Sequence, residues 1–186
     1  MFIKPSNNNQ VDFIERKTDE SNGMTTINTT HLKIGIVDFP NSIPIDVLCE
    51  STENSKKIFF VYSTSSMINC DNAVITIILD DKNRITLSPS RHLYCEKDKP
   101  FRDNKYYFPI SEKDFKSCCI ASSLELEIDE ANMTHPKKED GKELIDYCKL
   151  LYQNTFEKEA FPEAATYLQE KKKELSIIID KLNINK

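Results

Sequence analysis

The pattern of apolar and polar positions predicts a β-hairpin at residues 73–88, in the middle of the chain. Residues 73–79 form an almost continuous apolar run that is mostly β-branched, which favours a strand covered on both faces. Residues 80–83 are polar and typical of a turn, in which we expect Asn83 to take the left-handed conformation because no glycine is present. Residues 84–88 then alternate and return as the second strand.

Further strands are predicted on both sides of this hairpin. Each is marked by alternation or by a short apolar run, and they span residues 32–36, 45–49, 57–62, 91–95, 106–110 and 124–128. The strand at 57–62 is apolar on both faces. We expect it to pair with the strand at 73–79, because a loop of only ten residues separates the two.

A short helix is predicted after the strand at 106–110. Ser111 is suited to cap its N-terminus, because a serine hydroxyl accepts a hydrogen bond from a free N–H of the first turn. Phe115 and Cys118 or Cys119 are expected to face inward.

Two helices are predicted at the C-terminal end, over residues 142–156 and after Pro162. Their apolar positions recur at helical spacing and include Leu144, Cys148, Leu151, Leu168, Leu175 and Ile179. The strands at 57–62 and 73–79 need cover on their second face, and this stripe is the long apolar surface that remains. We therefore expect the helix pair (142–186) to dock on the sheet as part of the same core; the alternative is an exposed helical arm.

Two polar segments frame this core. Residues 1–30 are rich in Asn, Ser, Thr and charge, so a disordered or loosely docked arm is expected. Residues 131–141 are predicted to be a polar linker.

Strands followed by helices indicate the α+β class. We expect an antiparallel sheet of about six or seven strands over residues 31–130, arranged as a small sandwich or open barrel, with the two C-terminal helices packed on it.

The composition of the chain indicates in which compartment we expect the protein and which classes of partner are disfavoured. The net charge of -5 comes without a basic stripe, which disfavours a nucleic-acid partner. No apolar run reaches the roughly 20 residues of a membrane span, so no membrane partner is expected either. No secretory leader is recognisable, which predicts a cytoplasmic protein whose six cysteines are reduced.

Cysteine and histidine offer the one catalytic or metal-binding alternative. A thiol–imidazole pair would require His92 with Cys95, or His135 with Cys118 or Cys119, and no flanking signature supports either pair. As zinc ligands, His92, Cys95, Cys118 and His135 include only one pair that approaches the usual spacing. We therefore assign no catalytic residue, no metal and no cofactor. A small Cys/His-based enzyme or zinc protein remains the alternative function.

Aromatic residues suggest a binding surface. The candidates cluster around the strand at 106–110 and are Tyr94, Phe101, Tyr106, Tyr107 and Phe108. Alternation places Tyr107 on the face opposite Tyr106 and Phe108, so burying one set leaves the other for a partner protein or a small ligand. The competing interpretation is that the short helix covers them. The sequence thus favours a non-enzymatic binding or interaction module that uses this surface or the helix pair, and a homodimer is left open.

The middle of the chain also resembles a group of known sequences. The segments ITIILDDKNRITLS, YYFPISEKDFKSC and LELEI resemble small proteins of gut Bacteroidetes-type bacteria, over roughly Ala73 to Ile128. The resemblance implies a hairpin, an aromatic segment that leads into a short helix, and a closing strand. The chain departs from that pattern at Lys82-Asn83, where a glycine would be usual, and at Cys118-Cys119, where leucines would be expected. The resemblance implies no activity and no catalytic residue.

Overall fold

The computed structural model describes residues 14–29, 45–66, 73–96, 102–130, 137–158 and 160–164, and the helical positions 166, 170, 173 and 177. Four expected features fall outside these residues. They are the strand at 32–36, the aromatic residue Phe101, the candidate zinc ligand His135, and the apolar stripe Leu168, Leu175 and Ile179.

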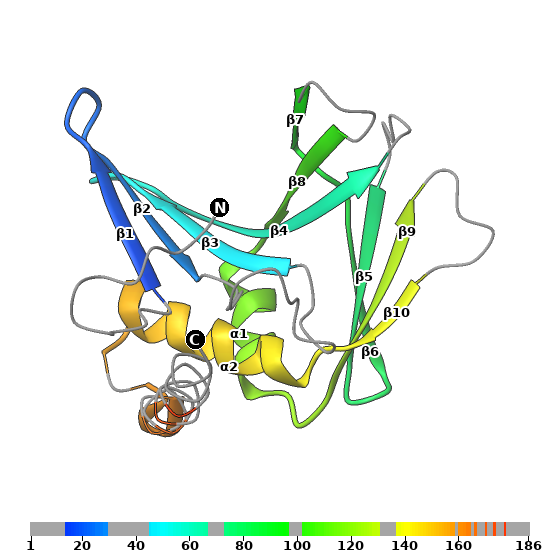
Figure 1. Ribbon diagram of the computed structural model, residues 1–186. Helices are drawn as coiled ribbons and strands as arrows, with labels where there is room; N and C mark the ends of the chain where they lie inside the picture. The colour runs from blue at the N-terminus through cyan, green and yellow to red at the C-terminus, as the bar shows by residue number, and fades with distance from the viewer. Residues whose placement is uncertain are drawn as a thin grey trace.

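The described chain forms two antiparallel sheets, the helices α1 and α2 and a further helical segment that begins at Pro162, which confirms the α+β class. The six-stranded sheet has the order β1-β2-β3-β4-β8-β7, and the four-stranded sheet has the order β10-β9-β5-β6 (Figure 1). The first sheet contains β1 (Ile14–Asp19), β2 (Met24–Thr29), β3 (Ile45–Ser51), β4 (Lys56–Ser66), β7 (Arg91–Glu96) and β8 (Arg102–Ile110). The second contains β5 (Ala73–Leu79), β6 (Asn83–Leu87), β9 (Leu124–Glu130) and β10 (Lys137–Asp140). Both sheets are open, so they form no closed barrel.

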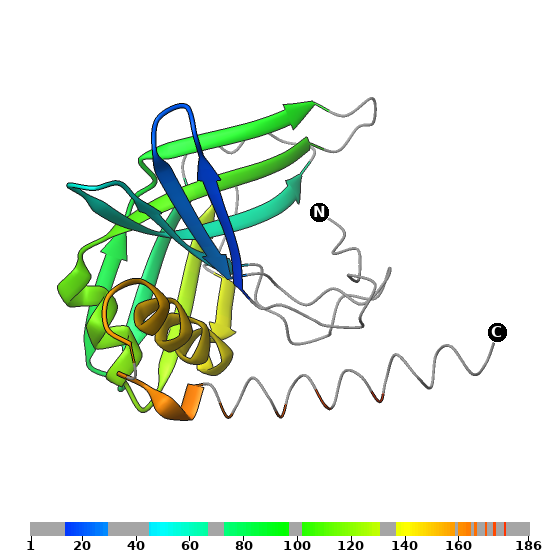
Figure 2. The same cartoon turned by 90° about the vertical axis from the view of Figure 1, so that its left-hand side faces the viewer.

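The two helices, α1 (Glu112–Ile120) and α2 (Lys142–Thr155), lie on the concave side of the six-stranded sheet (Figures 1 and 2). They share one core with the inner faces of both sheets. Its largest fully buried side chains include Phe60 of β4, Phe108 of β8, Phe115 of α1, Ile77 of β5 and Leu151 of α2. Because α2 contributes to this core, the predicted docking of the first C-terminal helix is confirmed.

The C-terminal end of α2 is held by cations from the sheet. Lys56 of β4 donates a hydrogen bond to the carbonyl oxygen of Thr155 at 2.6 Å, and Arg16 of β1 donates to that of Asn154 at 3.4 Å. The last turn of the helix has no basic residue of its own. Positive charge near the unpaired carbonyl groups of a helix C-terminus is stabilising, so these contacts fix α2 against the sheet.

The predicted hairpin is present as β5 and β6, and its turn differs from the expectation in one respect. Positive φ angles occur at Asp80 (51°) and Asp81 (57°), and Asn83 is already the first residue of β6. Short polar side chains tolerate the left-handed region because they can hydrogen-bond locally. The Asp80 carboxylate is held by a distant loop instead, since it accepts from the backbone N–H groups of Ser122 (2.9 Å) and Ser123 (3.0 Å).

The predicted short helix is confirmed as α1. The Ser111 hydroxyl accepts a hydrogen bond from the backbone N–H of Asp114, and Phe115, Cys118 and Cys119 are buried. The alternating strand before the linker is confirmed as β9, with Leu124, Leu126 and Ile128 facing the core.

Three expectations about the sheets need correction. The strands that are apolar on both faces, β4 and β5, were expected to pair with each other. Instead β4 pairs with β3 and β8, and β5 pairs with β6 and β9, so the two strands belong to different sheets. Residues 14–29 form the β1–β2 hairpin where we expected an arm, because Ile14 and Ile27 reach the core and Gly23 (φ 69°) makes the turn. Residues 137–140, within the expected linker, pair with β9 as β10.

Candidate functional site

The predicted aromatic residues divide between the two faces of the six-stranded sheet. Tyr106 and Phe108 are completely buried in the core, where their rings lie near one another. Tyr107 lies on the opposite, outer face and is partly exposed. The alternation was therefore predicted correctly, but the structure does not bring these residues together into one aromatic surface. The side chain of Tyr94 and the whole of Phe101 lie outside the described part of the chain.

On the outer face, Tyr107 is covered by an arginine from the neighbouring strand. The guanidinium carbon of Arg91 lies 3.9 Å from the centre of the Tyr107 ring and 5.7 Å from that of Phe59. The two rings meet edge to face with their centres 6.2 Å apart. Arg91 also donates a hydrogen bond to the Glu50 carboxylate at 2.9 Å. These contacts hold the guanidinium in one orientation, with its charge partly offset by Glu50 and by the ring.

Two exposed residues extend this region toward the end of the sheet. Leu93 of β7 is 48% exposed, and its cross-strand neighbour Lys105 of β8 is exposed as well. On the same face of β3 and β4, Leu48, Phe59 and Val61 form a small buried cluster against which Tyr107 packs. We call Arg91, Leu93, Lys105 and Tyr107 the outer-face patch. It combines an aromatic ring, an apolar side chain and two cations on a rigid sheet.

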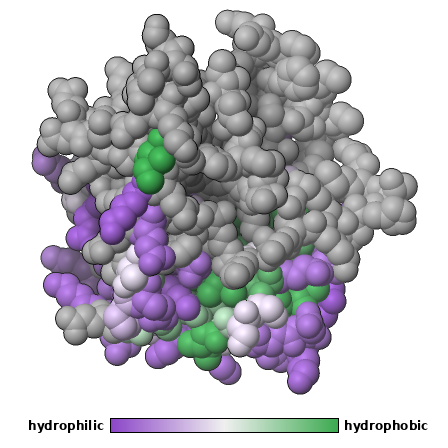
Figure 3. Space-filling model, turned by 60° about the horizontal axis from the view of Figure 1, so that its bottom comes forward, coloured by the Kyte–Doolittle hydropathy of each residue, from purple (hydrophilic) through white to green (hydrophobic). Residues whose placement is uncertain are grey.

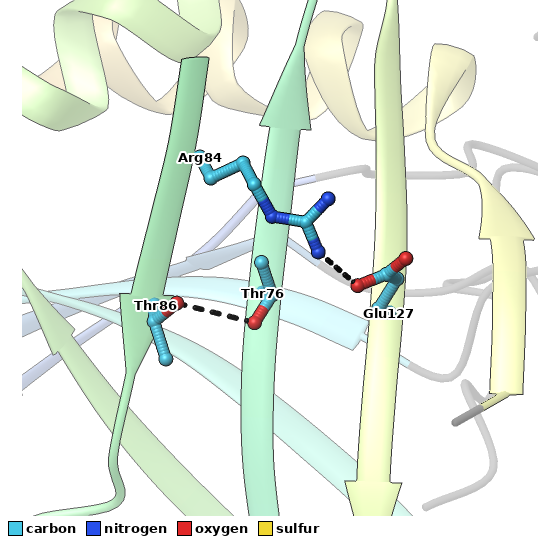
Figure 4. A network of polar contacts seen from close by, with 4 residues as sticks. All are labelled: Thr76, Arg84, Thr86 and Glu127. Carbon is cyan, nitrogen blue, oxygen red and sulfur yellow. Dashed lines mark hydrogen bonds and ion pairs between the residues drawn. The ribbon is translucent and has the colours of Figure 1, made fainter. Parts of the chain in front are cut away.

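The outer face of the four-stranded sheet is chemically different. Arg84 of β6 reaches across β5 and forms an ion pair with Glu127 of β9, and the hydroxyl groups of Thr76 and Thr86 lie 3.2 Å apart (Figure 4). These polar groups satisfy one another across three strands. The centre of this face therefore carries polar groups that are already paired with one another, whereas the apolar Val74 and Ile78 lie on the same face of β5 on either side of Thr76.

His92 points to the inner side of the six-stranded sheet. Its ring stacks on Tyr106 with the centres 4.3 Å apart and an angle of 7° between the planes. Its Nε2 lies 3.0 Å from Oδ1 of Asn104, a residue that is only 1% exposed. The imidazole is thus held by an aromatic ring and an amide, which gives it a structural role in closing the core.

The thiols that the structure describes are all free, buried and poorly suited to nucleophilic chemistry. They are Cys49, Cys118, Cys119 and Cys148. Burial raises the pKa of Cys118 and of Cys119 to about 12 and that of Cys49 to about 11, because a thiolate is poorly solvated in the core. Burial likewise raises the pKa of Cys148 well above its usual range.

The proposed zinc ligands are not assembled by the part of the chain that the structure describes. Among those residues, no group of three or more His, Cys, Asp or Glu side chains is placed to hold a metal ion. Cys118 lies in the core between α1 and α2, whereas His92 contacts Tyr106 and Asn104. His135 and the side chain of Cys95 lie outside the described positions.

Large apolar side chains are exposed at three separate places among the described residues: Leu93, Ile120 and Ile177. On the underside of the molecule, hydrophobic side chains lie between hydrophilic ones (Figure 3). No helix in the described part of the chain has the length and apolar character needed to cross a membrane.

Sequence reasoning missed three members of the outer-face patch, Arg91, Leu93 and Lys105. The alternation of β7 contained the information, because residues 91 and 93 share one face of a strand. What was missing was the pairing of Arg91 with Tyr107, which becomes visible only in the register of β7 and β8.

No family model, curated protein or solved structure matches this chain.

Proposed function

We propose that this chain is a non-enzymatic protein-binding module that contacts its partner through the outer-face patch. The observation that carries the proposal is the position of Arg91, whose guanidinium lies 3.9 Å above Tyr107 next to the exposed Leu93. Tyrosine and arginine are enriched among the residues that dominate binding energy in protein interfaces.

The arrangement suits binding because little of it has to be ordered when a partner arrives. Arg91 is already held by Glu50 and by two aromatic rings, and Tyr107 packs on a buried cluster. Immobilising a long side chain at an interface costs about 0.5–1.5 kcal/mol. Most of this cost does not arise on binding here, because the side chains are already ordered in the free protein.

The chemistry of the thiols supports binding over catalysis. A nucleophilic cysteine needs a lowered pKa and access to substrate, whereas Cys118 and Cys119 are fully buried and have raised pKa values. Free buried thiols also agree with a reducing compartment, so we propose a cytoplasmic site of action. The resemblance of residues 73–128 supports a bacterial source of the Bacteroidetes type.

Site-specific photo-crosslinking in cells that express the chain tests the proposed function. Benzoylphenylalanine is introduced in place of Leu93, in the patch, or in place of Thr86, which is exposed on the outer face of the other sheet. We expect one discrete protein adduct from position 93 and none from position 86. The same adduct should become at least about fivefold weaker when Lys105→Glu is added, because an exposed cation of the patch is reversed.

Two results would contradict the proposal. One is an equal set of adducts from both positions, which would indicate non-specific collision. The other is an adduct from position 93 whose yield does not change with Lys105→Glu. Circular dichroism of the purified variants shows whether the exposed substitutions leave the fold intact.

A further inference from the structure

The edges of the two sheets differ in how they are protected against pairing with another chain. An edge strand presents unpaired backbone N–H and C=O groups, and natural proteins shield such edges with charged residues, short strands or proline. The described strands leave four edges, formed by β1, β7, β6 and β10.

Three of these edges carry such protection. β1 contains Glu15, Arg16 and Lys17, and the first and last of these form an ion pair at 2.8 Å. β10 consists of four charged residues. β6 is five residues long, lies near β8, and places Arg84 in its ion pair with Glu127.

β7 lacks this protection at its centre. It is the outermost strand at the top of Figure 2, and its third residue is Leu93, which is 48% exposed on the outer face. An apolar residue in the middle of an accessible edge strand is the arrangement that natural sequences usually avoid. Its presence at one edge out of four indicates that this edge is used.

The charge beside Leu93 indicates which kind of segment fits there. Arg91 precedes it on the same face of β7, and Lys105 stands opposite it on β8, although the whole chain has a net charge of -5. Glu50, the described acidic residue nearest to Arg91, is already hydrogen-bonded to that guanidinium. Farther along the strand, the acidic residue Asp103 stands opposite Cys95 in the register. Positive charge along the β7 edge is therefore confined to the half that contains Arg91 and Leu93.

We propose that β7 binds an extended, acidic segment of a partner protein, which adds to the six-stranded sheet as a seventh strand. The inference rests on the proposed function and specifies its partner class. Backbone hydrogen bonds to β7 would supply affinity that does not depend on sequence. Carboxylates on the outer face of the added strand would lie opposite Arg91 and within about 10 Å of Lys105, which is the Debye length at 0.1 M salt.

The same charges favour this occupant over a second copy of the chain. Two-fold antiparallel pairing of β7 with itself would put Leu93 against Leu93 of the copy. It would also bring the Arg91 and Lys105 of both copies onto one continuous face. Like charges on adjacent strands oppose pairing, whereas an acidic segment is attracted to them.

The test uses the full chain and three synthetic peptides, EVEVEVE, KVKVKVK and EVEPEVE, each with blocked ends. Binding is followed by NMR titration, and the binding site is located by hydrogen exchange of backbone amides. We expect EVEVEVE to protect amides of Arg91–Glu96, with an affinity that falls as ionic strength rises. EVEPEVE should bind at least about tenfold more weakly, because proline removes a donor and breaks a strand.

Variants of the protein give the matched controls. Lys105→Glu should weaken EVEVEVE by about fivefold and strengthen KVKVKVK, whereas Thr86→Glu on the β6 edge should change neither affinity. Protection at another edge, equal binding of the proline peptide, or no protection at all would overturn the inference. A dimer in sedimentation experiments that Leu93→Lys dissociates would also overturn it, because the occupant would then be a second copy.

The inference and the proposed function can fail separately. If the adduct at position 93 depends on Lys105 but no peptide protects β7, the chain binds its partner through the patch without adding a strand. If both experiments fail, the outer face is not a binding surface.

Discussion

Asp80 and Ser123 exchange two hydrogen bonds. The backbone N–H of Asp80 donates to the carbonyl oxygen of Ser123 at 3.1 Å, and the Asp80 carboxylate accepts from the N–H of Ser123 at 3.0 Å. The pair ties the β5–β6 turn to the loop that connects α1 to β9. It also explains why a residue with φ of 51° is tolerated at the turn without glycine.

Replacing Asp80 tests this link. Asp80→Ala removes the acceptor of two backbone N–H groups and places alanine in the left-handed region, so we expect a loss of about 2–4 kcal/mol in the free energy of unfolding. Asp80→Asn keeps an acceptor oxygen and tolerates that region, and should cost about 1 kcal/mol. Urea denaturation measures both, and equal losses for the two variants would show that the hydrogen bonds contribute little.

Gly141 is predicted to be irreplaceable for a steric reason. A Cβ at this position would lie 2.1 Å from Cδ2 and 2.9 Å from the carbonyl oxygen of Leu124, a buried residue of β9. We expect Gly141→Ala to destabilise the fold by about 2–4 kcal/mol. The control is Gly23→Ala, which meets no atom within 4 Å and should cost only about 1 kcal/mol through its positive φ. A smaller effect at Gly141 than at Gly23 would contradict the steric argument.

The cation at the end of α2 gives a third prediction. Lys56 donates to the Thr155 carbonyl oxygen, and its Nζ lies 4.8 Å from the centre of the Phe156 ring. Lys56→Met retains most of the side chain but removes the charge, and should lower the free energy of unfolding by about 1 kcal/mol. Lys57→Met, one residue away on the outer face, should change it by less than about 0.5 kcal/mol. Thermal unfolding at low ionic strength compares the two.

The membership of α2 in the common core predicts cooperative loss of structure. Leu151 is completely buried, so Leu151→Ala should cost about 2–5 kcal/mol. Ile120→Ala, at a residue that is 68% exposed, should be close to neutral. Unfolding followed by far-ultraviolet circular dichroism and by tyrosine fluorescence should give one coincident transition for Leu151→Ala. Separate transitions would mean that α2 unfolds independently of the sheets.

The buried thiols predict a loss of stability at alkaline pH. Burial raises the pKa of Cys118 and Cys119 from 9.0 to about 12 in the folded protein. Above pH 9 the unfolded chain therefore binds fewer protons than the folded one. The stability that these two thiols contribute is fully present below pH 9. Between pH 9 and about pH 12, the free energy of unfolding falls by on the order of 1 kcal/mol per pH unit for each thiol.

The double variant Cys118→Ala/Cys119→Ala provides the control for that slope. It should be less stable at neutral pH because it leaves cavities, yet its stability should decline less steeply above pH 9. Urea denaturation across this pH range measures both slopes. Parallel slopes for the two proteins would show that these thiols are not the groups responsible.

Several elements followed from the sequence by itself, because their determinants are local. The β5–β6 hairpin, α1 with its Ser111 cap, the one-sided strand β9 and the apolar stripe of α2 all rest on a periodicity or a cap within a few residues. The same periodicity placed Tyr107 opposite Tyr106 and Phe108. The order of strands before helices then indicated the α+β class.

The tertiary structure decided what depends on residues far apart in the chain. β4 pairs with β8, between 36 and 52 positions away in the register, although the nearer β5 has an equally apolar pattern. Local alternation says which face a residue occupies but not which strand lies beside it, because pairing is set by the packing of the whole core. For that reason Tyr107 could be placed on a face from the sequence, whereas Arg91 above its ring could not.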